Sequence, residues 1–187
     1  MRVPDMQKRE NTMRVWDPIV RLFHWSLVVG ITMAWLTSSI RGQAHQWIGL
    51  VVGGLVALRI LWGFCGSRYA RFSDFIRSPR TIAAYIYQIA RGKEKRYVGH
   101  NPAGGAMVAA LVMMILLTIF TGWLMTTDTY YGDDFMQAVH SICAYTVLTM
   151  VVFHLLGVIL ASMRHSENLV RAMITGRKRQ PSGDDVA

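Results

Sequence analysis

Four long apolar stretches dominate the pattern of hydrophobic and polar positions along the chain. They lie near residues 19–38, 45–64, 105–126 and 138–162, and each is about 20 residues long or more. That is the length at which an α-helix crosses the hydrocarbon core of a bilayer. Polar segments separate the four stretches, so the pattern predicts an all-α integral membrane protein, a four-helix bundle of spanning helices.

The positive charges are distributed unevenly between the polar segments. They gather before the first stretch, between the second and third, and after the fourth, whereas the other two segments hold a single base, Arg41, and the acids Asp128, Asp133 and Asp134. Because short loops rich in Lys and Arg stay on the cytoplasmic side, both chain termini are predicted to be cytoplasmic. The first stretch is longer than a signal-peptide core and lacks a clear cleavage site, so we expect it to be retained as a span.

The composition supports a membrane protein and excludes two other classes. Hydrophobic residues make up 52% of the 187 residues, and the mean hydropathy is +0.29, which is too apolar for an ordinary soluble domain. The formal net charge of +9 would suit a nucleic-acid-binding protein. The bases flank the apolar stretches, however, so the membrane topology explains them and no nucleic-acid partner is expected.

Two polar segments have structure predictions of their own. A short surface helix is predicted around Arg80–Arg91, with Tyr85 and Tyr87 at the membrane interface, although a solvated connector fits the same residues. Residues 177–187 are predicted to be a disordered cytoplasmic tail. Residues 1–176 would then form one four-span domain.

Four histidines fall inside the apolar stretches, two near each predicted membrane face. The direction of each span places His45 and His140 near the outer face, and His24 and His154 near the inner face. His154 follows His140 by fourteen residues, which is about 21 Å of helix and close to a whole number of turns, so both project from nearly the same side. An imidazole in hydrocarbon is costly unless it is coordinated or hydrogen-bonded.

Pairing the histidines by depth gives two stacked sites, each with imidazoles from two different helices. Two neutral imidazoles make suitable axial ligands for haem iron, and bundle cofactor sites are built from facing helices. We therefore predict two haem b groups, bound without covalent attachment because the chain contains no C-x-x-C-H motif. Hydrogen-bonded structural histidines are the alternative. A bare zinc or copper centre is excluded because imidazoles about 21 Å apart on one helix cannot converge on one ion.

Two residues of the second stretch are candidates for contacts with these haems. Arg59 is the one charge well inside a span, and it lies fourteen residues after His45, hence on the same side. A haem propionate would neutralise it, unless the side chain snorkels to the inner interface. Gly49 follows His45 by one turn, where a missing side chain leaves room for a macrocycle or for a neighbouring helix.

Three further candidates lie at the inner face. Arg21 stands three residues before His24, where it would meet a propionate or mark the membrane border. His100 and Asn101 precede the third apolar stretch, where they would bind a quinone or a propionate. The pair Asn101-Pro102 would equally serve to start a helix.

Several of these residues resemble the motifs of a known family. His45-x3-Gly49-x9-Arg59 and His140-x13-His154 are similar to the second and fourth helices of bacterial cytochrome b561, and residues 15–25 and 99–105 resemble its first and third helix openings. The first-helix opening is shared with the cytochrome b subunits of nickel–iron hydrogenases. The resemblance covers about residues 13–176 and implies a diheme b-type cytochrome of the bacterial inner membrane, ligated by the four histidines, that exchanges electrons with quinones. The chain lacks the additional span usual in the hydrogenase subunits.

These patterns together predict electron transfer across the membrane, linking quinone or quinol to a periplasmic acceptor such as a c-type cytochrome or a reductase. The acids Asp128, Asp133 and Asp134 would dock a basic acceptor. Outward electron movement is favoured by up to about 2.3 kcal/mol per 100 mV when the interior is negative. The alternatives are a self-sufficient superoxide:quinone oxidoreductase, which the acidic loop disfavours, and a haem-free membrane transporter. The chain would be an enzyme only if it turns over quinone or superoxide by itself.

Overall fold

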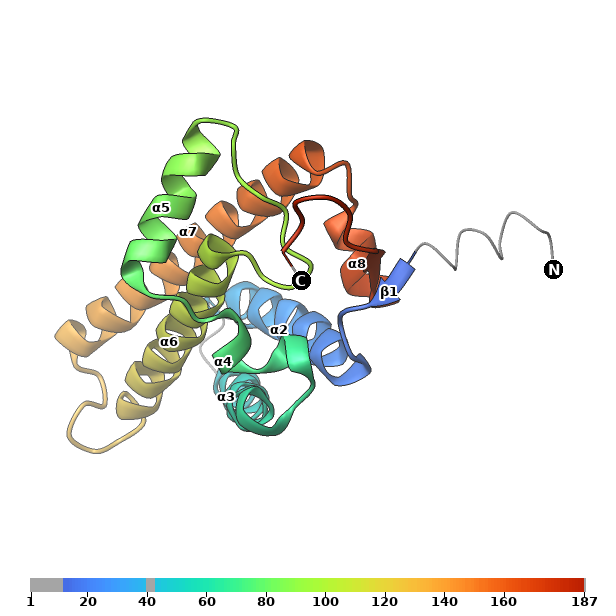
Figure 1. The fold of residues 1–187 in the computed structure, drawn as a ribbon. Coiled ribbons are helices and arrows are strands. Elements are labelled where there is room, and N and C mark those ends of the chain that lie inside the picture. Colours follow the sequence, from blue (N-terminus) through green and yellow to red (C-terminus); the bar gives the residue numbers. More distant parts are fainter. Residues whose placement is uncertain (1–11, 40–42, 187) are drawn as a thin grey trace.

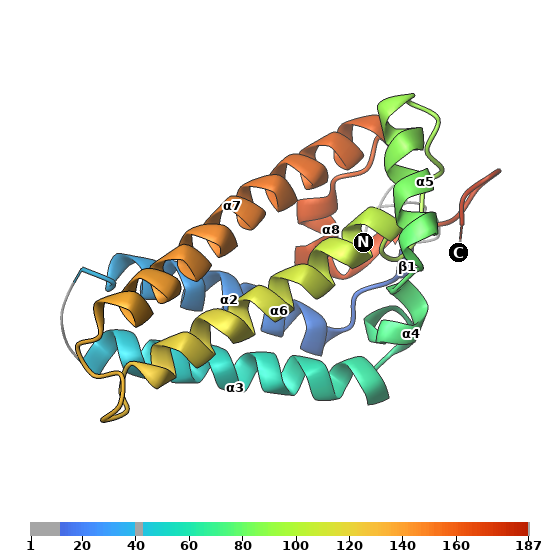
Figure 2. The same ribbon diagram turned by 90° about the vertical axis from the view of Figure 1, so that its left-hand side faces the viewer.

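Four long helices form the body of the protein. The computed structural model describes residues 12–39 and 43–186. Within these residues the long helices are α2 (Pro18–Leu36), α3 (Gln43–Cys65), α6 (Pro102–Leu124) and α7 (Asp134–Arg164). Each is long and apolar enough to cross a bilayer, and they run side by side (Figures 1 and 2). The predicted four-span helical bundle is confirmed, while Arg41 and the bases before residue 12 lie outside the described residues.

Side-chain caps determine where three of these helices begin. The carboxylate of Asp17 accepts a hydrogen bond from the Val20 backbone N–H at 2.9 Å, and the Asn101 side-chain oxygen accepts one from Gly104 at 2.7 Å. Asp133 caps α7 in the same manner. Such caps satisfy amide groups that the first helical turn leaves unpaired. The observed helices therefore start one to four residues before the apolar stretches, because capping residues are polar and hydropathy alone does not detect them.

The bundle packs in a chain of neighbours, with α2 on α3, α3 on α6 and α6 on α7. An apolar layer formed by Val52, Val56, Ile115 and Val147 lies at its centre. Gly30 permits close approach of α2 and α3, since a Cβ at that position would lie 2.7 Å from Cγ2 of Val52. Many large apolar side chains remain exposed on the outer faces of the long helices. Such a surface would be costly in water and suits contact with lipid.

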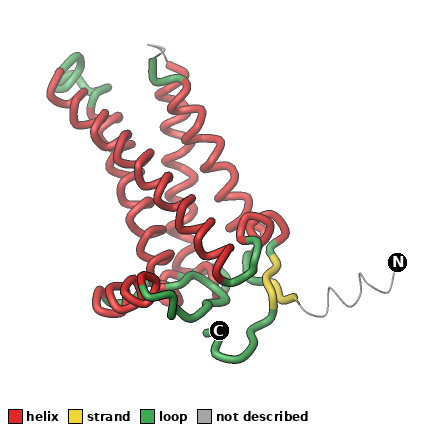
Figure 3. Tube along the Cα trace, turned by 90° about the horizontal axis from the view of Figure 1, so that it is seen from above, coloured by secondary structure: helices red, strands yellow, loops and turns green. Residues whose placement is uncertain are grey.

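One end of the bundle, here called the cap end, is covered by short elements. Figures 2 and 3 show these elements crossing one end of the long helices, with the turn between α6 and α7 at the opposite end, here called the loop end. The cap end consists of a 3-10 turn η1 (Arg68–Ala70), α4 (Phe72–Phe75), α5 (Pro79–Ala90), α8 (Leu169–Thr175), and the strands β1 (Thr12–Arg14) and β2 (Arg177–Arg179).

The surface helix predicted around Arg80–Arg91 is present as α5, but one of its tyrosines is placed differently from the prediction. Tyr85 is buried, its hydroxyl donates to the Lys95 backbone carbonyl at 3.2 Å, and its ring contacts that of Tyr97. Tyr87 is exposed. Tyr85 therefore packs inside the protein rather than at a membrane interface, because the chain after α5 folds back over that helix.

The C-terminal segment is also more structured than predicted. β2 pairs antiparallel with β1, with Met13 opposite Lys178. The Lys178 ammonium is buried and donates to the Val98 carbonyl at 2.8 Å, and Asp185 pairs with Arg96 at 2.6 Å. Over residues 177–186 the structure corrects the prediction of a disordered tail. The physical reason is that charges of the segment find partners on the loop before α6, which the sequence order does not reveal.

Candidate functional site

The structure brings His45 of α3 and His140 of α7 together at the loop end. Their ring centres are 6.2 Å apart, and the ring planes are perpendicular. Two imidazoles that ligate one metal from opposite sides have ring centres roughly 6 to 6.5 Å apart, because each metal–nitrogen bond is about 2.0 Å. The loop-end pair therefore has the separation that an axial ligand pair requires, as the depth argument predicts.

Hydrogen bonds leave the other ring nitrogen of each histidine available. Nδ1 of His45 lies 3.0 Å from the carbonyl oxygen of Ala34. Nδ1 of His140 lies 3.0 Å from the carbonyl oxygen of Thr118 and 3.1 Å from the Thr121 hydroxyl oxygen. A carbonyl only accepts, so the proton is on Nδ1, and Nε2 keeps the lone pair with which imidazole binds a metal. Partners of this kind orient histidine ligands.

Two glycines leave space around the loop-end pair. A Cβ at Gly122 of α6 would lie 3.0 Å from Cε1 of His140, so the absence of a side chain lets the imidazole rest against α6. Gly49 of α3 has nothing within 4 Å of the position its Cβ would take, which fits the open face predicted for it beside His45. Gly122, Thr118 and Thr121 were not predicted from the sequence, because single Gly and Thr residues in an apolar helix are common and no spacing links them to a histidine on another helix.

The second histidine level lies at the cap end. α7 is continuous from Asp134 to Arg164, so His154 is about 21 Å along the helix from His140. His24 of α2 lies near enough to His154 for the two imidazoles to interact electrostatically. Nδ1 of His24 is buried and has no hydrogen-bond partner among the described residues. The cap-end pair thus joins α2 and α7, whereas the loop-end pair joins α3 and α7.

Unpartnered nitrogen atoms are concentrated around the cap-end pair. Among the described residues, five buried side-chain nitrogen or oxygen atoms lack a hydrogen-bond partner, and four of them are nitrogens of Arg21, His24, Arg59 and His100. Burying a polar group without a partner costs free energy. Three of these residues, Arg21, Arg59 and His100, are among those predicted from the sequence to contact a cofactor at this level. Their unsatisfied N–H groups and two positive charges would suit an anionic, acceptor-rich group.

Arg59 is fixed within the protein and does not reach solvent. The side chain is 4% exposed, Nη2 donates to the Ala70 carbonyl at 3.0 Å, and the guanidinium carbon lies 5.2 Å from the ring centre of Phe72. Asp17 acts on Arg59 electrostatically. Its carboxylate accepts its hydrogen bonds from other groups, including the Trp62 indole at 3.3 Å. Nη1 of Arg59 therefore stays unpaired, and snorkelling to water does not account for this side chain.

Arg21 and His100 approach the same region from other elements. A Cβ at Gly176 would lie 2.7 Å from Nη1 of Arg21, and Gly176 has a φ of +77°, so glycine both forms the turn after α8 and makes room for the guanidinium. The His100 ring lies between Trp16 and Phe75, with both ring centres at 4.7 Å. Burial, with the charge of Arg59 contributing, lowers the pKa of His100 to about 3. His100 is therefore neutral at physiological pH and can donate a hydrogen bond from one ring nitrogen.

Asn101 has the structural role that was one of its two predicted functions. Its side-chain oxygen is engaged by the Gly104 amide as the cap of α6. In the part of the chain that the structure describes, no three His, Cys, Asp or Glu side chains come together as a metal cluster. The histidines are arranged as two pairs at two levels, and each pair draws on two helices.

Comparison with known proteins identifies a family. The family model described as prokaryotic cytochrome b561 matches residues 15–176. A probable Ni/Fe-hydrogenase B-type cytochrome subunit of Rhodobacter capsulatus is 21% identical, over 91% of this chain and 83% of that protein. A probable Ni/Fe-hydrogenase 1 B-type cytochrome subunit of Escherichia coli strain K12 is 24% identical, over 65% of this chain and 64% of that protein, so the match spans just under two thirds of that subunit. No solved structure matches significantly.

Proposed function

The chain belongs to the prokaryotic cytochrome b561 family, and from this premise we propose that it moves electrons across the membrane through two b-type haems, one at each histidine level. Family membership and the four apolar helices make it a multi-pass membrane protein that carries b-type haem and transfers electrons. The proposal adds the number of haems, their ligands and the redox partners.

The geometry of the loop-end pair carries the proposal. His45 and His140 have ring centres 6.2 Å apart, and Nδ1 of each lies 3.0 Å from a backbone carbonyl oxygen. Structural histidines need only the hydrogen bonds, and that alternative requires neither the ring-centre separation of a ligand pair nor a lone pair kept on both Nε2 atoms. His24 and His154 would hold the second haem at the cap end. Gly49 would let the macrocycle lie close to α3.

The unpaired nitrogens at the cap end support a place for haem propionates. Arg59, Arg21 and His100 would donate to these carboxylates, which would satisfy Nη1, Nε and Nδ1 respectively. Asn101 would contribute through its side-chain amide nitrogen, since its oxygen already caps α6. A quinone at this end would need the same donors. Because two of the three residues are positively charged, we assign the three nitrogens to the anionic propionates.

The residues of the chain would set the path and the electrostatics of transfer. When bound, the haems supply the one-electron redox chemistry. The four histidines define two levels in the bundle, and the apolar layer of Val52, Val56, Ile115 and Val147 would exclude water between them. Arg59 and Arg21 place positive charge at the cap end, where it favours the reduced state. With the cap end on the cytoplasmic side of an inner membrane, as the basic loops indicate, outward transfer is favoured by the membrane potential.

Quinol is the proposed donor, and a periplasmic c-type cytochrome or reductase the proposed acceptor. The relatives named as hydrogenase cytochrome subunits support assembly with a further redox protein. Of the three acids predicted to dock an acceptor, Asp133 is the cap of α7. Asp128 and Asp134 are exposed at the loop end and would make the contact. An acidic loop disfavours direct reaction with the superoxide anion.

Haem counting on four variants tests the proposal. The purified chain is expected to contain two haems by pyridine haemochrome assay and to titrate at two midpoint potentials. His45→Ala and His140→Ala should each eliminate one and the same potential, and His24→Ala and His154→Ala the other. His165→Ala, outside the spans, serves as the control that keeps both. A colourless chain, one haem at full occupancy, or loss of the same potential in His24→Ala and His45→Ala would contradict the assignment.

A further inference from the structure

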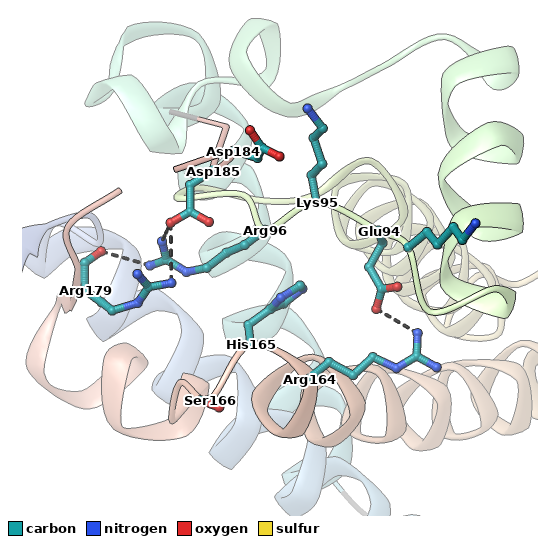
Figure 4. Close-up of a pocket in the computed structure, with 10 residues that line it drawn as sticks. Glu94, Lys95, Arg96, Arg164, His165, Ser166, Arg179, Asp184 and Asp185 are labelled. Carbon is teal, nitrogen blue, oxygen red and sulfur yellow. Dashed lines mark hydrogen bonds and ion pairs between the residues drawn. The ribbon is translucent and has the colours of Figure 1, made fainter. Parts of the chain in front are cut away.

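A polar pocket lies at the cap end, apart from both histidine levels. Its volume is about 650 Å³, within the usual range for ligand sites. Figure 4 shows that its walls come from three segments: the chain after α5, the end of α7, and the C-terminal segment. These supply the lining residues Lys93, Glu94, Lys95, Arg96, Arg164, His165, Ser166, Arg179, Asp184 and Asp185.

Several charges of this pocket already have partners, and two positive charges do not. Arg96 is bound by Glu167 at 2.9 Å and by Asp185 at 2.6 Å, and these ion pairs form a buried wall. Lys93 and Lys95 form no ion pair with any residue that the structure describes. Five Lys or Arg side chains face three carboxylates in the lining, so the pocket retains positive charge and favours an anion such as phosphate.

The pocket also contains an acceptor without a donor. Glu94 has a side chain only 6% exposed, and its Oε1 pairs with Arg164 at 2.7 Å. Its other oxygen, Oε2, is buried and has no hydrogen-bond partner among the described residues. A simple anion would be repelled by this oxygen. A ligand that fits must therefore bring a hydrogen-bond donor, such as an ammonium or a hydroxyl group, next to its phosphate.

An apolar groove adjoins the polar pocket. The groove has a volume of about 420 Å³ and is lined by residues at the end of α7 and the start of α8, among them Val158, Ile159, Met163 and Val170. Ser166 lines both the groove and the pocket. It has a φ of +50°, the one positive value among the described residues other than glycine. The chain thus turns sharply at the point where the polar and apolar surfaces meet.

We propose that these two cavities together bind one phospholipid of the leaflet at the cap end, with the head group in the polar pocket and an acyl chain in the groove. The phosphate would lie at Lys93 and Lys95, and an ammonium or hydroxyl of the head group would donate to Oε2 of Glu94. The groove lies at the end of a helix that is long and apolar enough to span the membrane, where acyl chains would be available. Basic pockets beside membrane helices commonly hold lipid head groups. The inference is independent of the haem assignment.

Native mass spectrometry of the full-length chain, delipidated in mild detergent and titrated with phosphatidylethanolamine, tests the proposal. We expect one tightly bound lipid per chain. Lys93→Gln/Lys95→Gln should weaken binding at least tenfold, and Met163→Asp should do the same from the groove side. Arg80→Gln/Arg171→Gln removes two charges of the same end outside both cavities, and should leave the affinity unchanged. Circular dichroism of each variant confirms that the helices are retained.

Two further arms identify the ligand. Glycerophosphoethanolamine and inorganic phosphate carry the head-group chemistry without acyl chains, and each should bind at least a hundredfold more weakly than the lipid. Glu94→Gln should reduce the preference for phosphatidylethanolamine over phosphatidic acid, which lacks the ammonium. Equal lipid binding in the pocket variants and the matched control would overturn the proposal. Equal affinity for the soluble phosphates would assign the pocket to a soluble ligand and overturn it likewise.

Discussion

Replacing Arg59 with glutamine is expected to lower the midpoint potential of the cap-end haem selectively. The guanidinium is buried and held by the Ala70 carbonyl, so its charge is fixed in place. A fixed positive charge near a redox centre stabilises the reduced state, which carries one more electron. Glutamine keeps a hydrogen-bond donor of similar shape and removes the charge, so the expected change is electrostatic.

The size of the effect follows from where Arg59 lies in the bundle. A unit charge about 10 Å from a redox centre, at an effective dielectric constant of about 20, contributes about 1.7 kcal/mol, or about 70 mV for one electron. Arg59 is fourteen residues along α3 from His45, about 21 Å, so the loop-end haem should shift by less than half as much. Salt screening reduces the distant effect further.

Spectroelectrochemical titration of the purified variant measures both potentials together. Arg68→Gln is the matched control, because Arg68 is an exposed arginine of the same end that stacks on Tyr69. We expect no more than a small shift for the control, since exposed charges are screened by water. A larger shift at the haem lost in His45→Ala than at the haem lost in His24→Ala would refute the placement of Arg59, as would the absence of any shift.

Three other predictions concern the cap and the loop-end pair. Arg96→Met leaves the carboxylates of Glu167 and Asp185 without their main partner in a buried network, and should lower the free energy of unfolding in detergent by about 3–5 kcal/mol, followed by circular dichroism. Burial opposes ionisation of Glu167, but the hydrogen bond from Arg96, the charges of Lys178 and Arg96 and the backbone hydrogen bond from Arg179 together outweigh it and lower the pKa. This contribution to stability is therefore complete above the ordinary pKa of about 4.3 and is lost as pH falls through the lower folded value. In Arg96→Met, the free energy of unfolding should therefore change less steeply with pH over this acid range than in the unchanged chain. Gly122→Val should displace His140 and remove only the loop-end haem from the difference spectrum. Gly54→Val is the control, because a Cβ there would meet nothing within 4 Å, and it should retain both haems.

Features set by local spacing could be predicted from the sequence. The apolar stretches are long enough to identify the spans without tertiary information, and the observed helices begin and end within a few residues of them. The caps Asp17 and Asn101 each precede a proline, which is a local signal for a helix start. The fourteen-residue spacing of His140 and His154 also fixes their separation and common face, because both lie on one continuous helix.

The incorrect predictions concern contacts between segments far apart in the chain. The tail was expected to be disordered because it is short and polar, yet Lys178 and Asp185 meet partners on the loop before α6. Tyr85 was expected at an interface because an aromatic on an amphipathic helix often lies there. It is instead covered by residues about ten positions later in the chain. Polarity indicates a preference for water, but a buried partner of opposite charge or complementary hydrogen bonding overrides that preference.

The sequence by itself determined the helical class, the four spans and the two levels at which imidazoles are available, since each depends on the rise of a helix and on local hydropathy. The tertiary structure alone decided which nitrogen of His45 and His140 is engaged, through Ala34 on α2 and Thr118 on α6, and which nitrogens of Arg21, Arg59 and His100 are left unpaired. These features depend on how the helices pack against one another, and hydrogen bonds between helices leave no periodic pattern along the chain.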